Sequence, residues 1–498
     1  MTTLPKSDFR KYRVLEMLPG ILVWATLILS TLLSFIRPLW VIIFIILFDL
    51  YWLLKVFYLS TFLIISYRRL KATVKKDWFT IVKKHPGFTD IVHLVIFPTY
   101  GENFTIIDST FQRLLQSNFP LEKCIIVVAT EAADRREGEP TAKKIQKKYE
   151  KHFKKFIITK HVLDKKTEIQ SKGSNIAHAG QEAKKYIDAQ KIPYENIVVS
   201  VFDIDTQVHR EYLSYLSHTY LNHPNPTRSS YQPVPVFHNN IWDAPAIVRV
   251  ASYGTTFWLM GEQIRPEKLF TFSSHSMSFQ ALVDVGFWSK DVVSEDSRIF
   301  IQCLLEYDGD YTLTPLYIPV SMDSVLSKTR IGTLAALYKQ QRRWAWGCEN
   351  IPFMLWNFTK NKTMPFRQKF RYVFTQIEGM HSWATAALII TVIGRLPLWF
   401  AGETIQTSVL FQNTPQLLNW MMNFALIGLI LSVIFSTALL PPIPKKHAKM
   451  KYITIILQWV LLPVSLIIFG AIPAIEAQTR LLIGKYLGFT VTEKTRKE

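Results

Sequence analysis

The fold of this chain is decided by the stretch Ile197-Val198-Val199-Ser200-Val201-Phe202-Asp203-Ile204-Asp205, in which a largely apolar run ends in two aspartates. A short apolar run rich in β-branched residues is typical of a buried strand in an α/β sheet. Carboxylates that directly follow such a strand lie at the carboxyl edge of the sheet, where open α/β folds bind their ligands. The stretch therefore predicts a buried strand that ends in a ligand site.

The same pattern of short β-branched runs and polar helical stretches extends from Asp90 to about Tyr317. The predicted strands are Ile91–Phe97, Cys124–Ala129, Phe156–Val162 and Ile197–Phe202. The predicted helices between them are Phe104–Gln116, Pro140–His152 and Asn175–Ala189. Strands that alternate with helices predict a parallel, Rossmann-like sheet. Tyr100, Glu131 and Asp203 follow strand ends, so we expect them at one edge of that sheet.

Composition predicts membrane spans beside a cytosolic part. The chain has 498 residues, too many for one ordinary core. Hydrophobic residues make up 49% and the mean hydropathy is +0.13, and their clustering indicates membrane spans. The three cysteines are far apart and give neither a disulfide framework nor a zinc spacing, which favours a reducing compartment. Much of the net charge of +20 flanks the spans without a nucleic-acid motif, which argues against nucleic acid as a partner.

Two apolar stretches near the N-terminus, Leu18–Ile36 and Leu39–Ser66, are separated by Arg37-Pro38. Each is long enough to cross a bilayer. The first lacks a small-residue cleavage site and the second follows at once, so we interpret them as an anchor hairpin rather than a removed signal peptide. Basic residues precede the first and follow the second, which predicts that both flanks face the cytoplasm.

Hydrophobic spans resume at Trp383–Phe400 and Trp420–Leu440. The loop Ala401–Gln416 carries no Lys or Arg, whereas Lys445–Lys451 carries four Lys, so the first loop is predicted outside and the second inside. Two prolines interrupt the last apolar stretch, Tyr452–Ile475. A single crossing would leave the basic tail outside, and a re-entrant hairpin, which we favour, would return it inside.

Asp203 and Asp205 alone are a weak signal, because an Asp-x-Asp triplet is expected about once by chance in a chain of this length. A second triplet, Asp308-Gly309-Asp310, contains a turn-forming Asp-Gly and predicts a turn. The first triplet follows a buried strand. There one carboxylate can hold a divalent cation and the other the ribose or diphosphate, since Mg²⁺ is usually bound by carboxylates and substrate phosphates.

Three more motifs each allow a structural and a functional interpretation. Ser294-Glu295-Asp296 is typical of an N-cap with an acidic first turn, and a carboxylate there can also be a general base. Gln340–Trp346 is typical of a basic interfacial helix with aromatic anchors. Alternatively, its Arg343 pairs with phosphate and its Trp344 walls an acceptor site. Lys172-Gly173-Ser174-Asn175 opens a helix and predicts a phosphate site by charge and dipole.

In this order, and between apolar spans, these motifs resemble the membrane-integrated glycosyltransferase family 2, the group that contains bacterial cellulose synthase, hyaluronan synthase and chitin synthase. The resemblance covers about Ile91 to Gly347. The matching elements are Pro98-Thr99-Tyr100-Gly101-Glu102, Glu131, Lys172-Gly173-Ser174-Asn175, Asp203-Ile204-Asp205, Tyr231-Gln232-Pro233, Asn239–Pro245, Phe272-Ser273-Ser274-His275, Ser294-Glu295-Asp296 and Gln340-Gln341-Arg342-Arg343-Trp344. The resemblance implies a GT-A domain, α/β and Rossmann-like, in the cytosol, with N- and C-terminal transmembrane helices.

The resemblance also implies a role for each matching residue. Asp296 would be the catalytic base, and Asp203 and Asp205 would hold Mg²⁺ or Mn²⁺. The implied nucleotide-sugar-binding residues are Thr99, Tyr100, Glu102, Glu131, Lys172, Asp203 and Arg343. The implied acceptor-binding residues are Ser274, His275, Glu295, Gln340 and Trp344.

Three departures limit what the resemblance carries over. Glu131 stands where the family usually has an aspartate near the uracil, so the nucleobase stays open. The Ser274-His275 loop differs from the family's loop beside the acceptor, so the product stays open. The membrane part is smaller than that of cellulose synthase, which leaves a full polymer channel open.

We therefore expect four parts: an N-terminal transmembrane hairpin (1–75), a GT-A domain (76–347), interfacial helices (348–380), and a C-terminal transmembrane region with a cytosolic tail (381–498). The predicted enzyme is an inverting family 2 hexosyltransferase of the plasma (inner) membrane. It would pass sugar from a nucleotide sugar, a UDP-sugar by resemblance, to a growing β-linked polysaccharide. Its expected partners are the donor, a carbohydrate or lipid acceptor and membrane lipids, and not nucleic acid.

Two other functions remain open. One is a single glycosyl transfer to a lipid or polyprenyl-phosphate acceptor, which the modest number of spans allows. The other is a transporter, because Asp49, Lys55, Glu378 and His381 lie in or near spans, where ionisable residues often mark a transport path.

Overall fold

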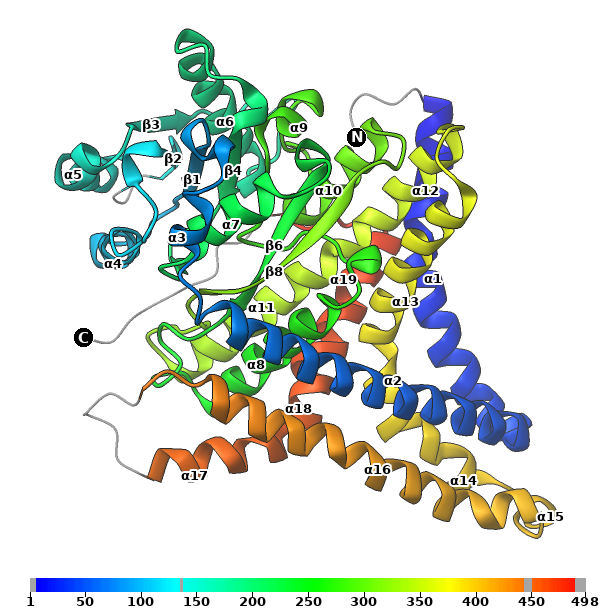
Figure 1. The fold of residues 1–498 in the computed structure, drawn as a ribbon. Helices are drawn as coiled ribbons and strands as arrows, with labels where there is room; N and C mark the ends of the chain where they lie inside the picture. Colours follow the sequence, from blue (N-terminus) through cyan, green and yellow to red (C-terminus); the bar gives the residue numbers. More distant parts are fainter. Residues whose placement is uncertain (1–5, 135–137, 443–449, 489–498) are drawn as a thin grey trace.

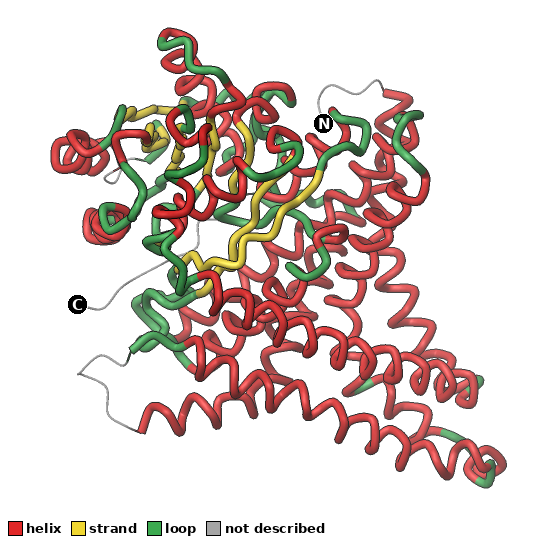
Figure 2. The backbone as a smooth tube through the Cα atoms, in the orientation of Figure 1, coloured by secondary structure: helices red, strands yellow, loops and turns green. Residues whose placement is uncertain are grey.

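The computed structural model describes residues 6–134, 138–442 and 450–488. They form an α/β domain that lies against one side of a group of long helices (Figure 1). The strands are gathered in the α/β domain, while the long helices carry none of the sheet (Figure 2). The basic loop predicted inside and the last basic residues of the tail lie almost wholly outside the described residues.

Among its described residues, the α/β domain contains one eight-stranded sheet in the order β3-β2-β1-β4-β7-β6-β8-β5. The strands are β1 (Val92–Pro98), β2 (Cys124–Glu131), β3 (Lys155–His161), β4 (Ile197–Val201), β5 (Gln207–Val208), β6 (Ser229–Val236), β7 (Ser276–Ser278) and β8 (Thr312–Ser321). The first four are parallel, as predicted, and lie within two residues of the predicted ends. The sheet as a whole is mixed. β7 runs antiparallel to both β4 and β6, and β5 runs antiparallel to β8, whereas β6 and β8 are parallel, so the prediction of a parallel sheet is wrong for β5 and β7.

The second half escaped prediction because its strands lack the usual pattern. β6 contains Pro233 and Pro235, which cannot donate to a ladder, and its pairing with β8 shifts register between Gln232 and Val234. β7 has only three residues, too few to show a period of two. These strands extend the sheet beyond β4, on the side that faces the long helices (Figure 1).

Helices cover both faces of the sheet. The helices of this domain are α3 (Trp78–Val82), α4 (Phe104–Leu114), α5 (Gly138–Tyr149), α6 (Lys172–Ala189), α7 (Tyr212–Leu221), α8 (Ala246–Glu262), α9 (Phe279–Asp284) and α10 (Glu295–Glu306). Side chains of a strand alternate between faces. Accordingly, Leu94 and Ile96 of β1 join the core beneath α6 and α10, and Val95 and Phe97 join the core beneath α4, α5 and α7.

The described residues contain five helical segments that are long and apolar enough to cross a membrane: Asp8–Ile36, Pro38–Thr73, Phe366–Phe400, Val409–Leu439 and Ile453–Leu482. They are built from α1 (Lys6–Ile36), α2 (Pro38–Thr73), α13 (Phe366–Thr391), α14 (Leu396–Phe400), α16 (Val409–Leu439), α17 (Met450–Leu457), α18 (Leu462–Leu466) and α19 (Ile472–Leu482). All the predicted spans are therefore helical, and most are longer than predicted. α1 and α2 follow one another directly and are joined at Arg37 (Figure 1).

The loop predicted at Ala401–Gln416 is mostly helical. It contains α15 (Glu403–Gln406) and the first turns of α16, whose N-cap Ser408 accepts a hydrogen bond from Phe411 N at 3.3 Å. The sequence predicted only a loop between two spans here, because hydropathy detects the strongly apolar remainder of α16 and not its mixed first turns.

The last apolar segment is helical throughout but changes its type of helix several times. α17, a 3₁₀ turn, α18, a π-helical turn (Ile467–Ala471) and α19 follow one another, with Pro463 and Pro473 in the first turns of α18 and α19. Near its start, Trp459 Nε1 donates to Ser436 Oγ of α16 at 3.1 Å. At its end, Arg13 Nη1 of α1 donates to Leu481 O at 2.7 Å.

Both ends of this segment lie on the side of the α/β domain. Ser436 is next to Phe435, whose ring lies 4.9 Å from that of Tyr67 in α2, and Arg69 of α2 donates to Tyr317 of β8 at 2.7 Å. After α19, the ring of Tyr486 contacts that of Trp346 at 6.4 Å. The two ends of the segment are thus held near residues that contact the α/β domain.

Candidate active site

Three motifs that are far apart in the sequence converge on the ammonium group of Lys172, the first residue of α6. Its Nζ lies 2.8 Å from Asp203 Oδ1, 3.1 Å from Asp296 Oδ1 and 3.7 Å from Glu295 Oε1. Burial opposes the charge of Lys172, but Asp203 and Asp296 outweigh it and raise the pKa of this ammonium. Lys172 therefore stays charged and holds the carboxylates of two elements together.

The backbone around Lys172 explains why the elements can meet. Ser171 caps α6 in a capping box with Ser174, so this helix begins three residues earlier than predicted. Gly173 sits where α6 and α10 touch: a Cβ there would lie 2.6 Å from Ser289 O and 3.0 Å from Glu295 Cβ. Glycine at this position thus permits the close approach of the two helices, and Asn175 ties α6 to β2 through a 3.0 Å hydrogen bond to Ala129 O.

Asp203 and Asp205 follow β4, as predicted, and are held by different partners. Asp203 Oδ2 accepts a hydrogen bond from Ser273 Oγ at 2.8 Å. Asp205 is only 1% exposed, and its Oδ2 accepts a hydrogen bond from Asp323 N at 2.8 Å. Asn239 Nδ2 donates to Asp205 O at 2.9 Å. The Asn239–Pro245 stretch thus supports the aspartate pair.

The aspartate pair suits a hard divalent cation by its donor chemistry. Among the residues that the structure describes, no three His, Cys, Asp or Glu side chains form a metal cage. Mg²⁺ is commonly held by only one or two carboxylates when substrate phosphates and water supply its other oxygens. Asp203 and Asp205 therefore fit Mg²⁺ or Mn²⁺ together with a phosphate ligand, and they do not fit a closed structural metal site.

Glu295 and Asp296 occupy the first turn of α10. Burial, and after it the charge of Asp296, raises the pKa of Glu295 well above the usual range of a carboxyl group. Thr271 Oγ1 donates to Asp296 O at 2.5 Å. Ser294 stands at the N-cap position, but the prediction that its side chain caps the helix is wrong, because its hydroxyl donates to Glu349 at 2.7 Å.

Ser274 and His275 are buried next to Asp296. Ser274 has a φ of 65°, and its hydroxyl lies 3.1 Å from Thr206 Oγ1. His275 Nδ1 lies 3.0 Å from Phe272 O and 3.9 Å from Asp296 Oδ1, and burial lowers its pKa. Both residues are at most 1% exposed, so they support the loop beside Asp296 from within the fold.

The Gln340–Trp344 motif lies on α11 (Arg330–Ala345), which leads through a 3₁₀ turn, Trp346–Glu349, into α12 (Asn350–Lys360). Gln340 is buried, and the charge of Arg343 acts on Glu295 and lowers its pKa against the larger effect of burial. The ring of Trp344 stands edge-on to Phe272 at 5.7 Å. The motif therefore lies close to Glu295 and to the loop that contains Phe272.

Thr99, Tyr100 and Glu102 form a closed turn after β1. Glu102 Oε2 accepts hydrogen bonds from Thr99 Oγ1 at 2.9 Å and from Tyr100 N at 2.6 Å. Gly101, with a φ of 80°, donates its amide to Asp134 Oδ2 at 2.7 Å. A residue with a side chain rarely adopts this conformation, so the glycine is required by the turn.

Glu131 is the last residue of β2 and is buried beside His161, at the end of β3. His161 Nδ1 lies 3.0 Å from Glu131 Oε2, and its Nε2 lies 2.8 Å from Glu168 Oε2. The hydrogen bond to Glu131 raises the pKa of His161 against its burial. The carboxylate predicted near the nucleobase is thus engaged with a histidine of the neighbouring strand.

Sequence reasoning missed four residues that hold this site: Asp134, His161, Ser273 and Glu349. Each acts through a partner that is distant in the sequence or lies in a loop, where periodicity carries no signal. Ser273 was quoted only as part of a loop, and Asp134 follows β2 closely enough that the rule of strand-end ligands could have found it.

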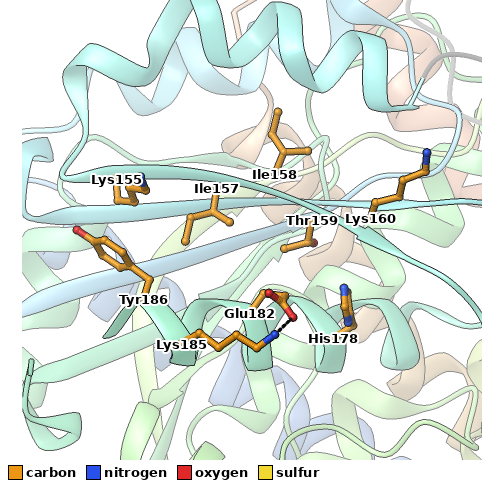
Figure 3. A pocket seen from close by; sticks show the side chains of 9 residues that line it. All are labelled: Lys155, Ile157, Ile158, Thr159, Lys160, His178, Glu182, Lys185 and Tyr186. Carbon is orange, nitrogen blue, oxygen red and sulfur yellow. Dashed lines mark hydrogen bonds and ion pairs between the residues drawn. The ribbon is translucent and has the colours of Figure 1, made fainter. Parts of the chain in front are cut away.

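A groove of about 550 Å³ lies elsewhere, at the outer edge of the sheet between β3 and α6 (Figure 3). Lysines stand around it, but Lys185 pairs with Glu182 and Lys160 with Glu139. Charged side chains along an exposed edge strand are a common protection against unwanted strand pairing. The groove is therefore explained without a ligand.

Comparisons with known proteins address the family and the fold. The family model described as Glycosyl transferase family group 2 matches residues 198–472, more than half of the chain. Similar solved structures include the mannosyltransferase PcManGT from Pyrobaculum calidifontis in complex with GDP-Man and Mn²⁺, with 14% identity, a TM-score of 0.43, and 77% of this chain and 99% of that chain covered. Another is a fragment of TarS from S. aureus in complex with UDP-GlcNAc, with 11% identity, a TM-score of 0.33, and 68% and 90% covered. No curated protein sequence matches.

Proposed function

The chain belongs to Glycosyl transferase family group 2, and we propose that it is an inverting hexosyltransferase of a membrane that extends a β-linked polysaccharide from a nucleotide sugar. The observation that carries this proposal is the meeting of Lys172, Asp203 and Asp296 at the ends of three separate elements, with Trp344 close by. Transfer from a diphosphate donor requires a cation for the diphosphate, a carboxylate for a metal ion and a carboxylate base. Here all three lie together at the carboxyl edge of a sheet.

The donor is proposed to bind with its diphosphate at Lys172 and Arg343. Lys172 carries its positive charge at the N-terminus of α6, and Arg343 carries its charge close to Glu295 of α10. A bound diphosphate would replace the carboxylates as the partner of Lys172. The turn at Thr99, Tyr100 and Glu102, with Glu131, would hold the nucleoside, which we expect to be uridine. Mg²⁺ or Mn²⁺ at Asp203 and Asp205 would supply charge neutralisation of the leaving diphosphate.

Asp296 is proposed to act as the base. It would accept the proton of an acceptor hydroxyl as the hydroxyl oxygen bonds to the anomeric carbon. The bond from that carbon to the diphosphate oxygen breaks at the same time, and its electron pair leaves with the diphosphate. Attack from the opposite face turns an α-linked donor into a β-linked product. Glu295, whose pKa is raised by burial, would be protonated and could hold the acceptor as a hydrogen-bond donor.

The acceptor is proposed to lie against Trp344, since the C–H face of a sugar ring packs on an aromatic surface. The acceptor site would be supported by the buried residues Gln340, Ser274 and His275, which lie behind its surface. Trp344→Ala should lose elongation more than donor hydrolysis, measured by the size of labelled product under donor excess. A single lipid-extractable species with one sugar, and no larger material, would favour the alternative of one transfer to a lipid or polyprenyl phosphate.

The enzyme is proposed to sit in the plasma (inner) membrane with its α/β domain in the cytosol. Within the part of the chain that the structure describes, five segments are suited to cross a membrane, and the last begins and ends near residues that contact the α/β domain. A cysteine at Gly402 should react with an impermeant thiol reagent in intact cells, and one at exposed Lys485 should not. Labelling of Lys485→Cys in intact cells would contradict this topology.

The transporter hypothesis depended on polar residues in the spans. Lys55 Nζ lies 2.5 Å from Glu378 Oε1, and Thr26 Oγ1 lies 2.9 Å from His381 Nε2. These pairs join α1 and α2 to α13, so they account for Lys55, Glu378 and His381 as ties between helices. We therefore keep glycosyl transfer as the proposal. Incubation of membranes with a panel of radiolabelled nucleotide sugars tests it, and absence of transfer from every donor, with Asp296→Asn indistinguishable from wild type, would contradict it.

A further inference from the structure

Glu349 lies outside every motif of the proposed site, yet it holds the helix that carries Glu295 and Asp296. Its Oε1 accepts three hydrogen bonds: from Val293 N at 3.1 Å, from Ser294 N at 3.0 Å and from Ser294 Oγ at 2.7 Å. The first amides of a helix have no partner within the helix and need one from outside. Glu349 accepts from the amide of the N-cap residue Ser294 and from that of Val293 before it, and the Ser294 hydroxyl donates to Glu349 rather than capping the first turn.

The second carboxylate oxygen of Glu349 faces Trp346, at the end of α11. Its Oε2 accepts a hydrogen bond from Trp346 Nε1 at 2.9 Å. Trp346 is 1% exposed and stands two residues after Trp344, whose ring contacts Phe272. One carboxylate thus joins the start of α10 to the end of α11, with Asp296 two residues from one anchor and Trp344 two residues from the other.

Neighbouring residues strengthen the same junction. Arg298 of α10 donates to Asn350 Oδ1 at 2.6 Å and to Glu349 O at 3.3 Å, and its guanidinium lies 3.8 Å from the ring centre of Phe353. Asn350 in turn donates to Ser297 Oγ at 2.8 Å. A negative charge at the N-terminus of α10 also complements the dipole of that helix.

We propose that Glu349 is a positioning residue that sets the place of the base Asp296 relative to the acceptor wall at Trp344. This inference rests on the proposed function. Four donors converge on its two oxygens, so only a side chain with acceptors at both positions satisfies them. Glutamine has the same shape, but its amide would turn a donor towards either the α10 backbone or Trp346.

The test compares Glu349→Gln with Glu306→Gln, which changes an exposed glutamate at the far end of α10. At saturating donor, kcat of Glu349→Gln should fall on the order of 10- to 100-fold, because displacements of about 1 Å cost that much, while the affinity for UDP–Mn²⁺ stays within about 2-fold. Glu306→Gln should match the wild type in both. Glu349→Asp, which keeps the charge but is one methylene shorter, should fall between.

Hydrogen exchange gives a readout that does not depend on activity. A peptide that covers residues 290–299 should exchange at least about 10-fold faster in Glu349→Gln, because the amides of Val293 and Ser294 lose their acceptor, while a peptide from β4 is unchanged. Unchanged exchange at 290–299 overturns the cap. Faster exchange with kcat within 2-fold of wild type, or a loss of kcat that follows lost donor affinity, overturns the positioning role. A wild type that transfers no sugar overturns the proposed function instead, and the exchange result still decides the cap.

Discussion

Two Asp-x-Asp triplets stand in this chain, and the structure gives them opposite surroundings. Asp203-Ile204-Asp205 follows β4, where Asp203 meets Lys172 at 2.8 Å and Asp205 is buried against the amide of Asp323. Asp308-Gly309-Asp310 forms a turn between α10 and β8, with positive φ at Asp308 and Gly309, and Asp310 pairs with Arg228 at the surface. The same Asp-x-Asp pattern thus lies where several elements pack together in one case and in a surface turn in the other.

The comparison teaches that the strand before a motif is more informative than the motif. A buried strand aims its last carboxylates at the edge where other strands and helix N-termini also end. A turn aims its carboxylates at water, where an ion pair is screened and contributes little. The four predictions below break or sharpen this difference, from the largest expected effect to the smallest.

Asp296→Asn sharpens the comparison because Asp296 and Asp203 both contact Lys172, and the variant removes the charge of Asp296 alone. Loss of a general base commonly costs on the order of 10²–10⁴ in rate, and asparagine keeps the shape of the side chain. We expect kcat to fall by that amount with the affinity for nucleotide sugar retained. Turnover of the purified variant within a few-fold of wild type would rule out Asp296 as the base.

Asp205→Asn tests the first triplet itself. Asparagine can still accept the hydrogen bond of Asp323 N, so the fold is expected to persist while the charge for a divalent cation is lost. Affinity for UDP–Mn²⁺, measured by calorimetry, should fall at least about 10- to 100-fold, since even the loss of a residue that only orients a metal ligand commonly costs that much. An unchanged affinity would place the metal elsewhere.

Much of this site could be predicted from the sequence, because it depends on local pattern. The strands before Glu131 and Asp203 and the helix that begins near Lys172 all show the right period, and their order fixes which ends share an edge. The remainder depends on distant partners. Nothing near Ser294 indicates that Glu349, 55 residues later, takes its hydrogen bond, and nothing near Glu131 indicates His161 as its partner.

His161 extends the comparison to a second buried carboxylate at the same edge of the sheet. Its hydrogen bond to Glu131 raises the pKa of His161 in the folded state above its unfolded value of about 6.5. The stabilisation is therefore complete below about pH 6.5 and is lost as pH rises through the folded pKa. His161→Gln should cost about 1–3 kcal/mol at pH 6 and less at higher pH, measured by thermal unfolding in detergent. A cost that grows with pH would contradict this sign.

Asp310→Ala is the smallest change and the control for the others. Asp310 and Arg228 form a surface pair whose side chains are 66% and 42% exposed. Exposed pairs of this kind contribute about 0–1 kcal/mol, so the variant should unfold within a few degrees of wild type. Its kcat and its affinity for UDP–Mn²⁺ should not change, because the turn lies at the end of α10 opposite to Asp296. If Asp310→Ala weakened nucleotide binding as much as Asp205→Asn, strand context would not distinguish the two triplets, and the assignment of Asp203 and Asp205 to the donor would lose its main argument.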